Sequence, residues 1–163
     1  MVIRNFLPIM TQVHPILIIF YVYFCPRIAQ MEKYILQEDI MLYGIHVKSF
    51  PVGIKASFDI LVEAFGGSQS YYGISWLAED GRVQYYASVS VPDYSEVNPA
   101  NYERLIIPKG EYTTCTIFDW LSKTGSVKDV FHELLGGACP TKERACIEWY
   151  KSDEEMLCMV RID

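Results

Sequence analysis

The chain of 163 residues repeats one order of structural signals in its two halves. In each half an extended apolar run precedes a helical pattern, a glycine pair and two further apolar runs. The pair Gly66-Gly67 ends the first helical pattern, and Gly136-Gly137 ends the second. A β-α-β-β order that occurs twice predicts an α+β fold, a tandem βαββ repeat with one antiparallel sheet and both helices on one face. The other face then meets solvent or curves into a ligand groove between the halves.

The first half contains three predicted strands and one predicted helix. The strands span Ile40–Phe50, Tyr71–Ala78 and Val83–Val91, and the Asp80-Gly81 step between the last two is typical of a hairpin. The helix precedes the second strand, and its apolar residues recur at helical spacing: Ile54, Phe58, Leu61, Val62 and Phe65. A polar stretch from Pro92 to Asn101 is expected to link the halves.

The second half follows the same plan. Arg104–Phe118 is predicted to be extended, with a bulge or kink at Pro108-Lys109-Gly110, because proline cannot donate to a central ladder. Ser126 is the expected N-cap of a helix. The apolar stripe of that helix consists of Val127, Val130, Phe131, Leu134 and Leu135. Two final strands, Ala145–Tyr150 and Met156–Ile162, are joined by a charged turn.

Length and charge limit the function classes. The chain is long enough for one domain with a sizeable core, and its net charge of −6 would repel a phosphate backbone. We therefore expect no nucleic-acid partner. The five cysteines form no C-x-x-C pair, and the three histidines lack metal-ligand spacing, so neither a metal nor another cofactor is expected. Ordinary buried thiols in a reducing cytoplasm are the expected state of the cysteines.

Residues 1–30 differ from the remainder, 31–163, which is expected to form the ligand-binding domain. Residues 6–25 are strongly apolar and reach the length of a membrane span, but prolines and polar residues interrupt the first half of this stretch. No small-residue cleavage site for a signal peptide follows. Three alternatives stay open, namely a dispensable leader, a membrane anchor, and an in-frame extension ahead of a true start at Met31.

One carboxylate stands in the middle of an apolar strand. Side chains alternate along a strand, so Ala145, Ile147 and Trp149 share one face, and Cys146, Glu148 and Tyr150 share the other. Charge is costly in such a setting unless it is paired. Glu148 is therefore the first candidate for a ligand counter-charge, with Tyr150 as a hydrogen-bond donor beside it. The alternatives are an exposed strand glutamate and a tyrosine that only packs on the sheet.

Aromatic residues near these strands are candidates for the walls of the site. A cation over an aromatic face gains about 0.5–2 kcal/mol, so a few rings and one carboxylate suit a lipophilic cation. Tyr85 and Tyr86 point to opposite faces, so only one of them can line a groove, and Tyr86 is the one that we select. The full set of expected ligand-binding residues is Glu148, Tyr150, Tyr72, Trp76, Tyr86, Phe118 and Tyr112. Tyr85 and Trp120 are further aromatic candidates.

Three short motifs give the chain a family resemblance. They are Phe-Pro-x-Gly before the first helix (50–53), Ile-Pro-Lys-Gly-Glu-Tyr (107–112) and Ile-Glu-Trp-Tyr (147–150). In this order, over about residues 38–163, they resemble the GyrI-like small-molecule-binding domain, the effector-binding domain of AraC- and MerR-type transcription activators. The resemblance implies a central groove for amphipathic, often cationic drugs, with Glu148 at the position of the family's pocket glutamate. No helix-turn-helix segment precedes the domain, so a stand-alone form is expected.

The expected function is to sequester or sense an amphipathic small molecule. Because some stand-alone members of the family hydrolyse strained cyclopropanoid toxins, one alternative is a hydrolase in which Glu148 is the general base and Tyr150 polarises the electrophile. Another member inhibits DNA gyrase, so a second alternative is a protein-interaction module that acts through an acidic surface. That surface would comprise Asp80, Asp93, Glu96, Asp153, Glu154 and Glu155.

Overall fold

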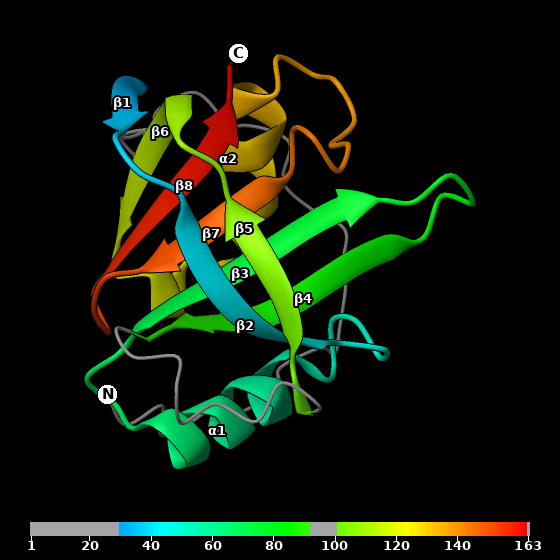
Figure 1. Ribbon diagram of the computed structural model, residues 1–163. Helices are drawn as coiled ribbons and strands as arrows, with labels where there is room; N and C mark the ends of the chain where they lie inside the picture. Colours follow the sequence, from blue (N-terminus) through cyan, green and yellow to red (C-terminus); the bar gives the residue numbers. More distant parts are fainter. Residues whose placement is uncertain (1–29, 92–100, 163) are drawn as a thin grey trace, which may run out of the picture.

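The computed structural model describes residues 30–91 and 101–162, and eight strands and two α-helices form its architecture (Figure 1). The first unit comprises β1 (Glu32–Leu36), β2 (Ile40–His46), α1 (Ile54–Phe65), β3 (Ser70–Leu77) and β4 (Val83–Ser90). The second comprises β5 (Glu103–Ile107), β6 (Gly110–Phe118), the 3₁₀ turns η2 (Trp120–Ser122) and η3 (Thr124–Ser126), α2 (Val127–Leu134), β7 (Cys146–Tyr150) and β8 (Glu155–Arg161). The leader and residues 92–100 of the expected linker lie outside the described residues.

All eight strands belong to one antiparallel sheet, in the order β1-β6-β8-β7-β3-β4-β2-β5. The predicted α+β class with one antiparallel sheet is confirmed, and each half contains the predicted β-α-β-β order with one further strand ahead of it. Strands β3 and β7 pair at the centre, so the two halves meet there. On either side the same sequence of strands runs outward, β3-β4-β2 in one half and β7-β8-β6 in the other.

Each unit also begins with a strand that pairs with the other unit. Strand β1 pairs with β6, and β5 pairs with β2. The extended run that was expected over Arg104–Phe118 is therefore two strands with different neighbours. The break falls where it was predicted, since Pro108 has no amide hydrogen to donate and Gly110 has a φ of 146°, which favours glycine.

This exchange of leading strands curls the sheet into a half-barrel. Leu36 of β1 pairs with Gly110 of β6, whereas Ile40, only four residues later, pairs with Ile107 of β5. A connection this short can cross from one side of the sheet to the other only if the two sides approach. The Lys109 amide donates a hydrogen bond to the Asp39 carboxylate over 2.7 Å. This bond joins the β5–β6 connection to the β1–β2 connection.

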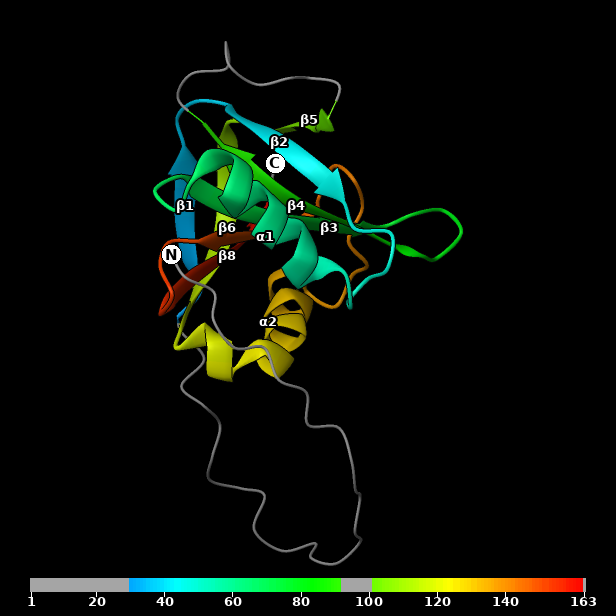
Figure 2. The same cartoon turned by 90° about the horizontal axis from the view of Figure 1, so that it is seen from below.

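Side chains fill the concave face of the curled sheet, and the helices cover its convex face. The buried members of the concave cluster are Leu42, Tyr72, Ile74, Ile107, Tyr112, Ile147, Leu157 and Met159. On the convex face α1 packs against β4, and α2 packs against β6 and β8. Figure 2 shows α1 in front of the strands and α2 below them. This arrangement leaves the middle of the convex face, over β3 and β7, between two separate cores.

Both helices bury the stripes that the sequence predicted. Phe58 and Leu61 of α1 are buried, as are Phe131 and Leu134 of α2. Helix α2 begins at Val127 with Ser126 at the N-cap position, as expected, but the Ser126 hydroxyl bonds to the Lys123 carbonyl and makes no capping bond to the helix. Within residues 30–91 and 101–162, no helix combines the length and the apolar character that crossing a membrane requires.

Candidate functional site

Glu148 occupies the middle of the convex face, between the two helix-covered cores. It lies on β7, which pairs with β3 on one side and β8 on the other. The predicted alternation is confirmed: Ile147 belongs to the concave cluster, whereas Cys146 is buried beneath α2. Tyr150 packs against both convex cores, so it bridges the halves beside Glu148.

Two tyrosines donate hydrogen bonds to the same carboxylate oxygen. The Tyr85 hydroxyl lies 2.8 Å from Oε2 of Glu148, and the Tyr150 hydroxyl donates to that oxygen as well. The two hydroxyl oxygens are 3.3 Å apart. Tyr85 reaches this position from β4, across the glycine of β3. No described residue donates a hydrogen bond to the second oxygen, Oε1, in the ranges 30–91 and 101–162.

A glycine makes room for this cluster. Gly73 pairs with Glu148 in the β3–β7 register. A Cβ atom at position 73 would lie 2.2 Å from the Tyr85 hydroxyl oxygen and 2.6 Å from Oε2 of Glu148. Both separations are far below van der Waals contact, so any side chain here would displace the tyrosine or the carboxylate.

Aromatic rings enclose the two tyrosines. Phe58 of α1 meets the Tyr150 ring edge-on at 5.2 Å, and Trp120 of η2 lies 5.0 Å from the same ring at a tilt of 55°. Phe50, which is partly exposed, stacks on Tyr85 at 5.4 Å. The Trp120 indole also donates to the Ser152 carbonyl over 3.0 Å, which fixes η2 to the β7–β8 turn.

The Glu148 carboxylate has no basic partner among the residues that the structure describes. The ion pairs there join Lys33 to Glu111, Lys55 to Asp59, Arg82 to Asp80 and Lys151 to Glu155. A small part of Glu148 stays accessible, but the protein packs densely around its carboxyl group. Burial raises the pKa of Glu148 above its ordinary value, while the hydrogen bonds from Tyr150 and Tyr85 oppose that rise.

The pKa values of the groups next to Glu148 are raised by burial and by the charge of Glu148. Burial, and then the negative charge of Glu148, raise the pKa of both Tyr85 and Tyr150 well above 10.0, so both phenols keep their protons. The pKa of the Cys146 thiol rises to about 12 for the same two reasons. Cys146 is thus a protonated, buried thiol, in agreement with the inert role that was expected for it.

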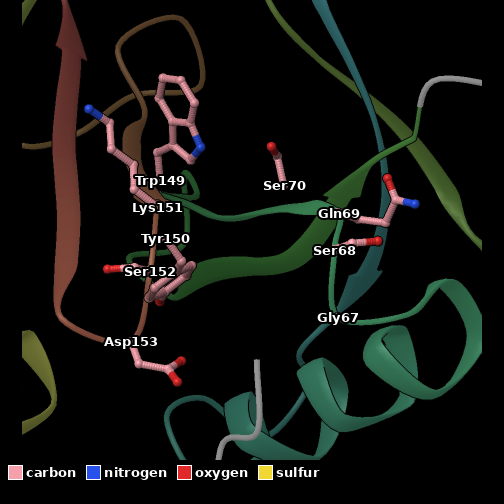
Figure 3. A pocket seen from close by; sticks show the side chains of 9 residues that line it. All are labelled: Gly67, Ser68, Gln69, Ser70, Trp149, Tyr150, Lys151, Ser152 and Asp153. Atoms are coloured by element: carbon pink, nitrogen blue, oxygen red, sulfur yellow. The ribbon is translucent and has the colours of Figure 1, made fainter.

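A hollow of about 430 Å³ lies at one end of the central strand pair (Figure 3). Residues 67–70 form one side of it, and residues 149–153 form the other. Tyr150 lines this hollow and also bonds to Glu148, whereas Glu148 itself is not part of the lining. The hollow and the carboxylate therefore share one tyrosine.

Four of the other predicted ligand-binding residues belong to the concave side of the sheet. Tyr72 stacks on Trp149 at 5.6 Å, and Trp76 stacks on Tyr86 at 5.5 Å. Tyr112 is buried in the concave cluster and donates to the Pro108 carbonyl. The fifth, Phe118, is 62% exposed at the end of β6. Of the predicted set, only Tyr150 contacts the Glu148 carboxylate, whereas Trp76 and Tyr86 meet each other on the concave side.

Tyr85, Phe58 and Trp120 complete the cluster in place of those residues. Tyr85 rather than Tyr86 points toward Glu148, because Tyr85 shares the helix-covered face of β4 with Ala87 and Val89. The Tyr86 hydroxyl instead donates to Glu103 over 2.9 Å. A usable signal was Gly73, since a glycine inside a strand often marks the close approach of another group.

The residues of the predicted acidic surface do not all have the same surroundings. Asp153 and Glu154 of the acidic set are exposed in the β7–β8 turn, whereas Asp80 and Glu155 are ion-paired. Asp93 and Glu96 lie outside the described residues. Over residues 30–91 and 101–162, no cluster of three or more histidine, cysteine or acidic side chains has an arrangement that could hold a metal ion.

The chain was compared with known families, curated proteins and solved structures. No family model matches it, and no curated protein matches it in sequence. An integron cassette protein from the mobile metagenome of Vibrio cholerae has a TM-score of 0.53 at 14% identity, over 84% of this chain and 97% of that one. The structure of SAV2435 bound to tetraphenylphosphonium has a TM-score of 0.58 at 13% identity, over 82% and 94%.

A third similar structure is an uncharacterized conserved protein from Listeria innocua. Its TM-score is 0.52 at 10% identity, over 85% of this chain and 94% of that one. At such low identities the likeness establishes the fold alone. The chain therefore has the fold of these three structures over most of their length.

Proposed function

We propose that the protein contains a GyrI-like small-molecule-binding domain that binds lipophilic organic cations, with Glu148 as the counter-charge. The observation that carries this proposal is the Glu148 carboxylate, which has two tyrosine donors on one oxygen and no basic partner in the described part of the chain. An unpaired carboxylate is costly in such a setting. An arriving cation reduces that cost, so the site favours positive ligands over neutral ligands of the same shape.

The aromatic surroundings support the same ligand class. The rings of Phe58 and Trp120 pack on Tyr150, and each ring that faces a bound cation contributes about 0.5–2 kcal/mol. SAV2435, which has the same fold, was solved with tetraphenylphosphonium, a lipophilic cation. We expect the present protein to bind such ions in the cytoplasm and so to sequester or sense them.

The test compares a cation with a neutral molecule of similar shape. Tetraphenylphosphonium and triphenylphosphine oxide are titrated into wild type and into Glu148→Gln, and heat and intrinsic fluorescence are recorded. We expect wild type to prefer the cation, and Glu148→Gln to lose at least about tenfold in affinity for the cation alone, equivalent to about 1.4 kcal/mol. Glu143→Gln, an exposed change in the α2–β7 connection, is the matched control. Equal losses for both probes would exclude the counter-charge role.

Hydrolysis of a strained electrophile is the second candidate function. The raised pKa of Glu148 is the observation in its favour, because general bases work best with a pKa near the operating pH. Against it, the Tyr150 proton is directed at Glu148 and not at an open substrate position. Incubation with a cyclopropane-bearing electrophile, followed by mass spectrometry, separates the two functions, since only an enzyme yields a hydrated product in excess of its own concentration.

A further inference from the structure

The hollow beside Tyr150 exists because the two units differ in one connection. At this end of the β3–β7 pair, Tyr71 and Tyr150 are the last partners in register, and the strands then part. Residues 66–69 join α1 to β3, which is too short a connection to fill the gap. At the opposite end, the longer α2–β7 connection, residues 135–145, closes the corresponding gap, and its Pro140 carbonyl accepts a hydrogen bond from the Leu77 amide over 3.1 Å.

The charges around the hollow favour a cation. Asp153 is one of the residues that line it, and the carboxylate of Asp153 has neither an ion pair nor a hydrogen bond with any residue in the described ranges. Lys151 also lines it, but its ammonium group pairs with Glu155 at 3.3 Å and lies 5.2 Å from the Trp149 ring. Among these three charged side chains, one negative charge is left over.

The adjacent helix adds to this negative potential. Helix α1 ends at Phe65, directly before the Gly67–Ser70 side of the hollow, and no basic residue stands in its last turn. The C-terminal end of a helix dipole is negative and attracts cations. Figure 3 shows α1 leading into Gly67, with the Asp153 side chain on the other side of the hollow.

Tyr150 connects this hollow to the site of the proposed function. Its ring lines the hollow, and its hydroxyl bonds to Glu148. Five residue steps separate Glu148 from Asp153, so their Cα atoms lie at most about 18 Å apart. A volume of about 430 Å³ lies within the range of small-molecule pockets and accommodates one end of a ligand.

We propose that this hollow is a second cation subsite and that the ligands of the protein are elongated dications, with one charge near Glu148 and the other near Asp153. The inference rests on the proposed function, because it uses Glu148 as the first of the two anchors. A compact ion such as tetraphenylphosphonium would occupy only the first subsite. An ion with two cationic ends on an apolar linker would engage both.

The experiment compares one cationic end with two. Alkane-α,ω-bis(triphenylphosphonium) ions of increasing linker length, and alkyltriphenylphosphonium ions with the same alkyl chains, are titrated by calorimetry into the full chain. We expect the dication to bind about tenfold more tightly at the best linker length, since the second contact forms within one complex. Asp153→Asn should weaken dications about threefold to fivefold, the size expected for one partly exposed charge pair, and leave single cations unchanged.

The outcomes distinguish this inference from the proposed function. If Glu148→Gln weakens both probes while Asp153→Asn weakens only dications, both proposals are supported. If dications and single cations bind alike, or if Asp153→Asn changes nothing while Glu148→Gln still weakens both, the second subsite is excluded and the first stands. If neither probe binds, or if Glu148→Gln has no effect, both proposals fail. Glu143→Gln serves as the control for a general loss of negative charge.

Discussion

Gly73 lies directly across the central strand pair from Glu148, and the absence of a side chain at position 73 provides the space for the Tyr85 hydroxyl. Each half contributes one of these facing residues, so the two halves differ in residue type where they meet. Strand β7 carries a carboxylate at the paired position, and strand β3 carries a residue without a side chain there. The pair is thus a site that neither repeat could form alone.

Gly73→Ala is expected to destabilise the protein and to impair cation binding. The added methyl group would lie 2.2 Å from the Tyr85 hydroxyl oxygen, and overpacking of this kind costs about 1–3 kcal/mol. Urea unfolding measures the free energy, and titration with tetraphenylphosphonium measures the binding. Gly125→Ala is the control, because a Cβ atom there meets no described atom within 4 Å. Unchanged stability in Gly73→Ala would contradict the close packing at this position.

The free energy of unfolding is expected to fall as the ionisation of Glu148 proceeds with rising pH. Burial raises the pKa of this group in the folded protein above its ordinary value of 4.5, so the folded state holds the proton more tightly than the unfolded state does. The contribution is complete below the ordinary pKa and is lost as the pH rises to the folded-state pKa. Urea unfolding of wild type and of Glu148→Gln at several pH values in this window gives the difference between their free energies of unfolding.

The free energy of unfolding of wild type minus that of Glu148→Gln should decrease as the pH rises and then level off. The titratable groups around Glu148 are Cys146 and Tyr150 on its own strand, Tyr85 on β4 and Cys158 on β8, and burial keeps all four protonated over the window. Cation affinity should increase over the same window, since the ligand pairs with the ionised form. A difference that increases with pH would show that the carboxyl is stabilised as an anion instead.

Tyr85→Phe and Tyr86→Phe should separate binding from stability. Tyr85→Phe removes one of two donors to Glu148, which disfavours the ionised carboxylate, so cation affinity should fall about threefold to tenfold at neutral pH. Tyr86→Phe removes the hydrogen bond to Glu103 on the concave side, with a stability cost of about 0.5–1.5 kcal/mol and no change in binding. Parallel titrations and unfolding curves test both. Equal binding losses would mean that the two faces of β4 are not distinct in function.

Trp120→Phe should loosen the contact between η2 and the β7–β8 turn. The change removes the indole hydrogen bond to the Ser152 carbonyl and part of the contact with Tyr150, and we expect a stability loss of about 1–2 kcal/mol. Thermal and urea unfolding measure it. Trp76→Phe is the matched control, because Trp76 is only partly buried and its indole bonds to no residue in the described part of the chain. A smaller loss for Trp120→Phe than for the control would contradict this anchoring role.

Local pattern predicted the elements of the fold well where one segment contains the whole signal. The stripes of α1 and α2, the glycines that follow them and the alternation in β7 are all local, and each appears in the structure. The strand β1 was not predicted. It is short and has charged residues at Glu32 and Lys33, and it pairs with β6, which is far away in the sequence. When a strand is stabilised mainly by a partner that is distant in the sequence, its own residues need not show a strand pattern.

The candidate site shows the same division. The position of Glu148 in an apolar strand was visible from the sequence, as was the shared face of Tyr150. The choice between Tyr85 and Tyr86 was not, because alternation separates two neighbours without saying which face lies under a helix. Among the aromatic partners, Trp120 was named as a candidate and Phe58 was not. Both come from segments that are distant from β7 in the sequence and that contact Tyr150 only in the tertiary structure.

The sequence by itself therefore determined the repeat, the class of fold and the apolar strand that contains the Glu148 carboxylate, since each follows from periodicity over a few residues. Only the tertiary structure decided that the convex face holds the carboxylate, that Gly73 and Tyr85 complete its surroundings, and that one short connection leaves a hollow beside Tyr150. The physical reason is that these features depend on the curl of the sheet. That curl arises from the exchange of β1 and β5 between the halves, which is a pairing over long sequence distances.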